Sequence, residues 1–296
     1  MSNSLLHRIS DWTIPPAVQK VLYSKICQLK FRRDIPHDLS AKFLENRKYK
    51  DLHKGERCFI LATGPSINRQ NLLPLRNEIC ISVSNFFLHE DAEAVNPKYH
   101  VFAPNHEPFN WDKLEKEFMI LTRYSLSDTT FFIGYAPYKY SQKNFLDQYP
   151  KYRPEKYQFI DYSVLSEINE NNYGDPKIWD ISKNPFSIRT VVYSAIQIAA
   201  YMGFNEIYLL GVDHDYLYDS SSVEGPSHFY SKSDSPMDDT ILYAKEKMFL
   251  EYHNRWKEYR LIRDCLRERR IFVYNATDGG MLDVFPRITL KEALSQ

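Results

Sequence analysis

The chain has 296 residues and a balanced charge, with 38 Lys and Arg against 38 Asp and Glu. This balance argues against a nucleic-acid-binding protein, because the basic surface of such proteins usually shows in the residue count. Four scattered cysteines without a CxxC pair or zinc-ligand spacing indicate a reducing compartment. There is no N-terminal apolar signal segment and no apolar run of about eighteen residues, so neither a signal peptide nor a membrane span is predicted.

Residues 1–54 are expected to form a helical N-terminal extension, followed by one main domain at 55–296. In the extension, residues 17–33 mix apolar side chains with lysines and arginines in the pattern of an amphipathic basic helix. Two interpretations stay open: this helix lies on an anionic membrane surface, or it packs on the main domain or on a second copy in a homo-oligomer.

The main domain begins with Arg57–Ser66, an apolar run that ends in a turn of small residues. Cys58–Ala62 has the continuous apolar character of a buried parallel strand, and Thr63, Gly64, Pro65 and Ser66 form the turn. We expect a helix to follow with Ser66 as its N-cap, and a helix N-terminus after a Gly turn is a natural phosphate seat. An ordinary turn between a strand and a helix is the alternative, because a single Gly is a weak signal.

Two further strands are predicted at Glu78–Val83 and Tyr99–Ala103, and an asparagine follows each of them, Asn85 and Asn105. Ligands of doubly wound sheets bind at the carboxyl ends of strands, so these side chains would meet beside the first turn. Phe118–Thr122 and Phe131–Gly134 are expected to be short strands. Residues 135–184 lack clear periodicity and are interpreted as an inserted lid or acceptor-binding region.

The second strong pattern is Ser187–Met202, a long apolar helix that Gly203 ends, followed by the buried strand Glu206–Gly211. A strand, a helix and a second buried strand in this order indicate a Rossmann-like α/β fold, with a mostly parallel sheet and helices on both faces. Arg189, at the start of the helix, could hold an anionic group or pair with a carboxylate.

The C-terminal part contains a loop at 218–239 with one histidine, His228, of the kind that often supplies a general acid or base. A long helix is predicted at Thr240–Arg270, a last strand at Ile271–Tyr274 and a final helix at Arg287–Leu294.

Asp213 and Asp215 follow the strand at Glu206–Gly211, with a histidine between them. In an extended chain the two carboxylates would point the same way and could bind Mg²⁺ with a diphosphate donor. The alternative is that Asp213 only caps the adjacent loop by hydrogen bonds.

Several stretches together resemble a known family. They are ATGPS at 62–66, Ser84 and Asn85, residues 187–216, PSHFY at 226–230 and YNATDGG at 274–280. They resemble the bacterial sialyltransferases of glycosyltransferase family forty-two. They are equally similar to the wider family that contains motility-associated glycosyltransferases and archaeal 6-hydroxymethylpterin diphosphokinases. The resemblance covers roughly residues 55–294 and lies in the order and spacing of the motifs.

For the sialyltransferase pattern, the resemblance implies that residues 63–66 contact the nucleotide of a CMP-sugar, and that Asn85 and Asn105 hold its cytidine, ribose or phosphate. It makes His228 the general base that deprotonates the acceptor hydroxyl, and Tyr216 and Tyr218 stabilisers of the departing phosphate. This chain departs from the pattern in three places: Thr63 stands where the family has Asn, Asp215 competes for one tyrosine position, and the segment at 212–215 is more acidic.

The sequence therefore predicts a glycosyltransferase that moves a sialic acid-like or related acidic sugar from a CMP-sugar to a surface glycan or lipid-linked glycan. Phosphate leaving-group chemistry with a histidine base needs no metal in principle, so no cofactor is expected to be essential. A cytoplasmic enzyme at the inner face of the membrane would suit the basic extension. The alternatives are a Mg²⁺-dependent diphosphokinase, which would use Asp213 and Asp215, and a non-catalytic nucleotide-binding protein.

Overall fold

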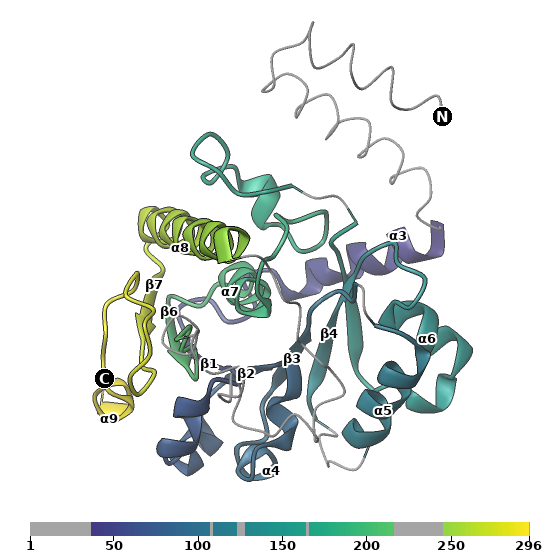
Figure 1. Cartoon of the computed structure of the whole chain (residues 1–296), viewed down its shortest axis with the longest axis horizontal. Coiled ribbons are helices and arrows are strands. Elements are labelled where there is room, and N and C mark those ends of the chain that lie inside the picture. Colours follow the sequence, from purple (N-terminus) through teal and green to yellow (C-terminus); the bar gives the residue numbers. More distant parts are fainter. Residues whose placement is uncertain (1–36, 107–108, 123–127, 164–165, 216–244, 296) are drawn as a thin grey trace, which may run out of the picture.

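The computed structural model describes residues 37–106, 109–122, 128–163, 166–215 and 245–295. They form an α/β fold around one seven-stranded sheet in the order β5-β4-β3-β2-β1-β6-β7, with helices on both faces (Figure 1). Every pair of neighbouring strands is parallel. The predicted fold class is confirmed, and the sheet is wholly rather than mostly parallel.

The strands are β1 (Arg57–Leu61), β2 (Cys80–Val83), β3 (Tyr99–Phe102), β4 (Thr130–Tyr135), β5 (Tyr157–Asp161), β6 (Glu206–Leu210) and β7 (Phe272–Asn275). The α-helices are α3 (His37–Leu44), α4 (Ala92–Val95), α5 (Trp111–Leu121), α6 (Gln142–Gln148), α7 (Val191–Met202), α8 (Lys245–Glu268) and α9 (Leu290–Ser295). Short 3₁₀ helices are η1 (Glu45–Tyr49), η2 (Pro65–Arg69), η3 (Leu73–Asn77), η4 (Ser84–Leu88), η5 (Pro150–Tyr152) and η6 (Pro176–Trp179).

The strand order reverses at β1. From β1 the chain adds β2 to β5 on one side, and then returns through α7 to place β6 and β7 on the other side. The neighbours β1 and β6 stay in register to their carboxyl ends, where Leu61 lies opposite Leu210. In open parallel sheets this reversal opens a crevice beyond the strand ends, and ligands bind there.

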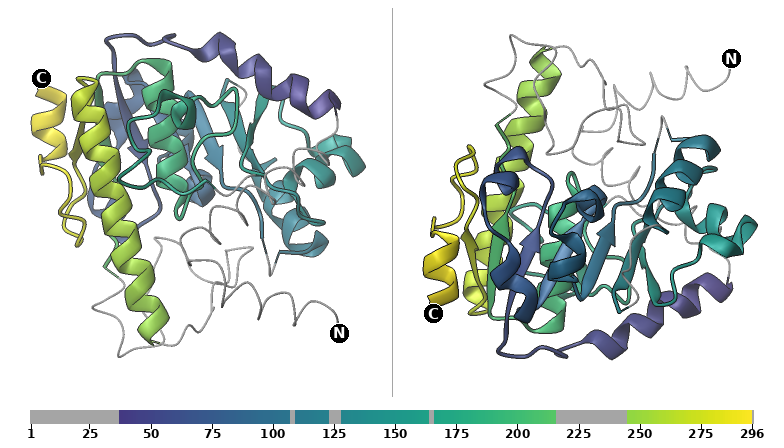
Figure 2. Two further views of the ribbon diagram at one scale, coloured as in Figure 1. Left: turned by 90° about the horizontal axis from the view of Figure 1, so that it is seen from above. Right: turned by 90° about the horizontal axis from the view of Figure 1, so that it is seen from below.

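Helix α7 is the central element of one face. It packs on β1, β2 and β3 and shares a large apolar core with α8, and Figure 2 shows both helices over this face in the view from above. The Thr190 side chain accepts a hydrogen bond from the Val192 N–H at 3.4 Å and so caps the helix, and Gly203 ends it at φ 88°. The helix predicted from residue 187 therefore begins at Val191, because residues 187–190 are not helical.

The predicted strand at 118–122 is wrong, because these residues lie in or just after α5. Asn110 caps α5 by accepting a hydrogen bond from the Lys113 N–H at 3.0 Å. Leu114, Phe118 and Leu121 then fall on one buried face at helical spacing. A short apolar run fits a strand or a helix equally well by periodicity alone, and here the capped helix is what forms.

The region at 135–184, interpreted as an insertion, is integral to the sheet where it is described. It contributes α6 and the edge strand β5, which pairs with β4 from Tyr157 to Asp161. In the preceding extension, α3 packs against β5, while the predicted amphipathic helix at 17–33 lies outside the described residues. In the described part of the chain, no helix is long and apolar enough to cross a membrane.

Glu117 is an acidic residue on the buried face of α5. It is 5% exposed, and its Oε2 atom has no hydrogen-bond partner within the described structure. Burial raises the pKa of this carboxyl to about 8. Since the folded pKa lies above the unfolded value, the folded state keeps a proton that the unfolded state loses. Stability is therefore highest at acid pH and falls as the pH rises from about 4.5 towards 8.

Glu117→Gln is thus expected to stabilise the protein by about 4 kcal/mol at pH 8 and to change little at pH 4, because the amide cannot ionise. Urea unfolding of both proteins at the two pH values measures this. Glu115→Gln, at an exposed position on the same helix, is the matched control. An equal gain at both pH values in Glu117→Gln would contradict the titration of Glu117.

Candidate functional site

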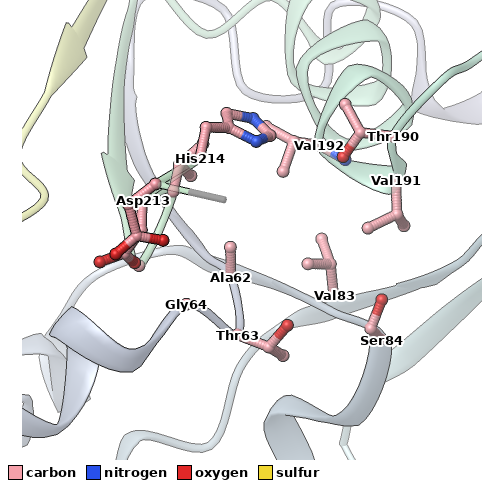
Figure 3. A pocket seen from close by; sticks show the side chains of 13 residues that line it. Ala62, Thr63, Gly64, Val83, Ser84, Thr190, Val191, Val192, Asp213 and His214 are labelled. Atoms are coloured by element: carbon pink, nitrogen blue, oxygen red, sulfur yellow. The ribbon is translucent and has the colours of Figure 1, made fainter. Parts of the chain in front are cut away.

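A cavity of about 100 Å³ opens at the carboxyl ends of β1, β2 and β6. Its lining consists of Ala62, Thr63, Gly64, Val83, Ser84, Thr190, Val191, Val192, Gly211, Val212, Asp213, His214 and Asp215. In Figure 3, Asp213 and His214 stand on one side, Thr190 and Val191 on the other, and Thr63 and Ser84 along the lower rim. The cavity thus occupies the crevice that the strand order predicts.

Two lining residues have a backbone conformation that is costly for a side chain. Ser84 and His214 both have φ 50°, directly after β2 and close after β6. Positive φ at residues other than glycine costs about 1–3 kcal/mol, and such residues cluster at functional sites because surrounding structure must hold them there. The two strained residues therefore mark the same crevice as the cavity does.

The turn after β1 is joined to the end of β6 by Asp213. The Ser66 hydroxyl donates to Asp213 Oδ2 at 2.8 Å, and the Ser66 N–H donates to Asp213 Oδ1 at 3.2 Å. The predicted N-cap at Ser66 is wrong: η2 is a short 3₁₀ helix whose N-cap is Gly64, and Ser66 lies inside it. The reason is that Asp213, which follows the neighbouring strand β6, accepts hydrogen bonds from both the N–H group and the hydroxyl of Ser66.

Only glycine fits at position 64, because the junction has no room for a side chain. A Cβ atom there would lie 1.8 Å from Asp213 Oδ2 and 2.5 Å from the Gly211 carbonyl oxygen. The Gly64 N–H donates to that same carbonyl at 2.8 Å, so the turn lies directly against the end of β6. Gly64 thus acts through a close approach of two chain segments.

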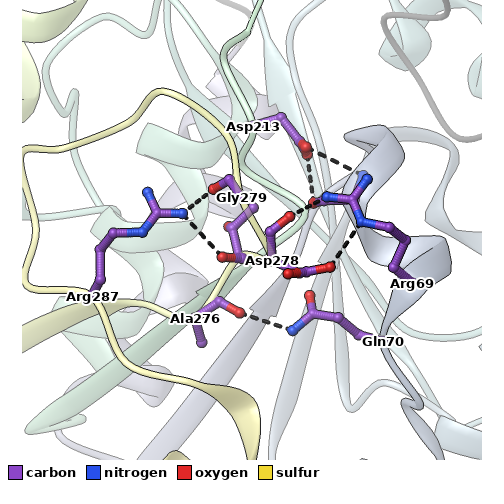
Figure 4. A network of polar contacts seen from close by, with 9 residues as sticks. Arg69, Gln70, Asp213, Ala276, Asp278, Gly279 and Arg287 are labelled. Atoms are coloured by element: carbon purple, nitrogen blue, oxygen red, sulfur yellow. Dashed lines mark hydrogen bonds and ion pairs between the residues drawn. The ribbon is translucent and has the colours of Figure 1, made fainter.

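The loop after β7 closes the outer side of this junction (Figure 4). Arg69 Nε donates to Asp278 Oδ2 at 2.8 Å, and Gln70 Nε2 donates to the Ala276 carbonyl at 2.9 Å. Arg287 donates to the carbonyls of Thr277 and Gly279 in the same loop. These contacts attach β7 and its loop to η2, and so hold the strand ends around the cavity.

Burial raises the pKa of Asp213 above its ordinary value, the Ser66 hydrogen bonds lower it, and the nearby Asp215 raises it further. His214 is buried, which lowers its pKa to about 3, so its imidazole is neutral at physiological pH. Its Nε2 lies 2.8 Å from the Tyr259 hydroxyl on α8. The lining thus combines a neutral imidazole with two carboxylates, of which Asp213 is held by Ser66.

The other predicted site residues fall in four groups. Thr63 and Gly64 line the cavity. Asn85 and Asn105 are buried but do not line it, and Asn105 Nδ2 donates to the Tyr140 carbonyl at 3.5 Å. Arg189 pairs with three glutamates and so is already neutralised. The remaining predicted residues, Tyr216, Tyr218 and His228, lie outside the described residues.

Three polar lining residues were not singled out as ligand contacts by the sequence: Ser84, Thr190 and His214. Each lies one to four residues after a strand or directly before a helix, and this position is the one feature of the sequence that could have identified it as a ligand contact. Asp213 and Asp215 both line the cavity, but within the described ranges no three His, Cys, Asp or Glu side chains gather as a metal site.

Comparisons with known proteins give a likeness of fold. No family model matches the chain, and no curated protein matches it by sequence. A structure of the sialyltransferase CstII from Campylobacter jejuni with the substrate analogue CMP-3FNeuAc is similar, at 16% identity and a TM-score of 0.43. A second, of the sialyltransferase CST-II with a trisaccharide acceptor and CMP, is 15% identical at a TM-score of 0.43. Each match covers 79% of this chain and 86% of the other chain.

Proposed function

We propose that the chain is a sialyltransferase-like glycosyltransferase, which moves a sialic acid-like or related acidic sugar from a CMP-sugar to a glycan or lipid-linked glycan. The observation that carries the proposal is the cavity at the reversal point of the sheet. It is lined by the Thr63–Gly64 turn and by Thr190, which belong to the stretches that resemble family forty-two. The hydroxyls of Thr63, Ser84 and Thr190 in this lining suit a phosphate leaving group.

In this proposal Thr63 and Gly64 contact the donor nucleotide at the floor of the crevice. Tyr216 and Tyr218, which follow Asp215 in the sequence, stabilise the departing phosphate. His228 removes the proton from the acceptor hydroxyl as the glycosidic bond forms. Because the developing charge is spread over a phosphate and an oxocarbenium-like sugar, neutral donors and one base suffice without a metal.

The donor class is tested by thermal unfolding of the protein with CMP, CDP, UDP, GDP, AMP and ATP, each with and without Mg²⁺. A ligand at one hundred times its dissociation constant stabilises the folded state by about 2.7 kcal/mol. We expect CMP to raise the unfolding temperature in the absence of metal. No shift with CMP under either condition would contradict the proposal.

A Mg²⁺-dependent diphosphokinase is the second candidate, because Asp213 and Asp215 line the same cavity, where the nearby Asp215 raises the pKa of Asp213. It requires Asp213 to exchange Ser66 for a metal ion. Stabilisation only by ATP or a diphosphate together with Mg²⁺ would favour this function and would overturn the CMP-sugar proposal.

His228→Ala is expected to lower turnover about 100-fold or more while leaving CMP affinity nearly intact, because a general base acts on the transition state and not on the bound nucleotide. The measurement is the initial rate with a CMP-sugar donor alongside CMP titration. A variant that turns over as fast as the parent would reject the role of His228. Loss of rate and nucleotide affinity together would instead assign it to binding.

A further inference from the structure

A second, larger cavity lies at the other end of the strands, near the amino ends of β1, β6 and β7. Its volume is about 380 Å³, and it is lined by Lys50, Asp51, Pro176, Lys177, Trp179, Asp180, Lys183, Ala200, Tyr201 and Arg269. Helix α7 joins the two cavities, because Val191 lines the first and Tyr201 the second. Twelve helical residues span about 18 Å, so the second cavity is separate from the candidate active site.

Several positively charged side chains line this second cavity. Among the described residues, Lys50, Lys177 and Arg269 form no ion pair with a carboxylate. The lining acid Asp180 is already bound, because Lys183 pairs with it at 3.0 Å and the Ser182 hydroxyl donates to it at 2.6 Å. Within the described structure, the lining thus carries three cations without an ion pair against one such carboxylate, Asp51, and this excess of positive charge favours an anionic ligand.

Arg269 is held in a fixed orientation. Its guanidinium lies 5.0 Å above the ring of Trp179, and Nη2 donates to the Gly174 carbonyl at 3.4 Å. The Trp179 ring is itself fixed, since its Nε1 donates to the Tyr173 carbonyl at 2.9 Å. A stacked guanidinium loses little freedom on binding and can donate two parallel hydrogen bonds to a carboxylate or phosphate.

The end of α7 does not oppose an anion here, because its last carbonyls are all bound. The loop after η1 donates from the Asp51 N–H to the Tyr201 carbonyl at 3.0 Å, and from the His53 N–H to the Met202 carbonyl at 2.8 Å. The N–H groups of Gly203 and Phe204 donate hydrogen bonds to the carbonyls of Ala200 and Ala199. The negative end of the helix is thereby covered by donors of the chain itself.

The remaining polar groups indicate what kind of anion fits. The Asp51 carboxylate, which has no ion-pair partner in the described residues, can accept hydrogen bonds from hydroxyl groups of a ligand. Arg269 covers the Trp179 ring, which is 3% exposed, so this ring offers no open face on which a nucleobase could stack. We propose that this cavity is a second binding site for an anionic sugar, one that bears a carboxylate or a phosphate.

The test is isothermal titration of the full chain with four probes: a trimer of N-acetylneuraminic acid, glucose 6-phosphate, neutral maltotriose and inorganic phosphate. We expect at least one anionic sugar to bind about tenfold more tightly than maltotriose and than inorganic phosphate. The better of the two anionic probes identifies whether a carboxylate or a phosphate is preferred. Equal binding of maltotriose, or of inorganic phosphate, would overturn the proposal.

Lys177→Glu and, separately, Lys50→Glu locate the binding. Both side chains are exposed, so the variants should fold, and each is expected to weaken the preferred anionic sugar about tenfold. Lys291→Glu, an exposed charge reversal on α9, is the matched control and should leave the affinity unchanged. Unchanged affinity in both Lys177→Glu and Lys50→Glu would place the sugar elsewhere and reject the site.

This site does not depend on the proposed activity, and CMP separates the two. If CMP stabilises Lys177→Glu as much as the parent while the anionic sugar binds more weakly, the second site is established independently of the first. If CMP stabilises neither protein, the proposed transferase fails, and the effect of Lys177→Glu on the sugar still decides the second site.

Discussion

Gly64→Ala is expected to lower the free energy of unfolding by about 3 kcal/mol or more. The added methyl group would stand 1.8 Å from Asp213 Oδ2 and 2.5 Å from the Gly211 carbonyl oxygen. The carboxylate could swing away, but it would then lose both hydrogen bonds from Ser66. The carbonyl cannot move without separating β1 from β6, which pair in register up to this point.

Urea unfolding measures the effect, with Gly174→Ala as the matched control. A Cβ at Gly174 meets nothing within 4 Å, so this variant should stay within about 0.5 kcal/mol of the parent or be slightly more stable. The same two variants should differ in CMP binding, because only Gly64 lines the cavity. A Gly64→Ala protein as stable as Gly174→Ala would show that the two strand ends are not in close contact.

The sequence predicts the sheet well where burial is complete. Cys58–Ala62 and Glu206–Gly211 are continuous apolar runs, and they become β1 and β6 almost without change. By contrast β5 lies at the sheet edge, where Tyr157 and Gln158 are only half-buried. An edge strand needs apolar residues at fewer positions, so its pattern does not stand out from the Tyr- and Pro-rich segments around it.

The candidate site shows the same division. That Thr63, Gly64 and Asp213 stand at strand ends follows from the alternation of strands and helices. Strand order does not follow from it, and this order decides which ends meet. Asp213 follows β6, a direct neighbour of β1, whereas Asn105 follows β3, two strands away and therefore about 10 Å from β1. Strand order therefore accounts for the absence of Asn105 from the cavity lining, but not for that of Asn85, which follows β2, a direct neighbour of β1.

The contacts of Arg189 are likewise not predictable from local sequence. Its three partners come from two other segments of the chain, Glu167 from the loop after β5, and Glu251 and Glu258 from α8. The guanidinium lies 2.7 Å from Glu258 Oε1 and 2.7 Å from Glu251 Oε2. Arg189 also directly precedes Thr190, which caps α7 and lines the cavity. One residue thus ties α8 to the start of the helix that forms the wall of the site.

Arg189→Met is therefore expected to destabilise the protein by about 3–5 kcal/mol, because it leaves a buried carboxylate without its counter-charge. The Glu258 side chain is only 7% exposed, and burial already raises its pKa against the lowering effect of Arg189. The loss of stability should be smaller when the buried carboxylate of Glu258 is also replaced by a neutral group. Arg189→Met combined with Glu258→Gln should recover at least half of the lost stability, which a double-mutant cycle by urea unfolding measures.

The same cycle decides between the two roles considered for Arg189. If the charge of Arg189 only compensates the glutamates of α8, the double variant should recover CMP affinity together with stability. Thr190 and Val191 would then return to their places in the cavity wall. If the guanidinium also holds the phosphate of the donor, stability should recover while CMP affinity stays about tenfold or more below that of the parent. Glu167→Gln, which removes an exposed partner, is the control and should change stability by less than about 1 kcal/mol. A double variant that remains as unstable as Arg189→Met would mean that packing of the arginine stem, rather than compensation of Glu258, holds α7 to α8.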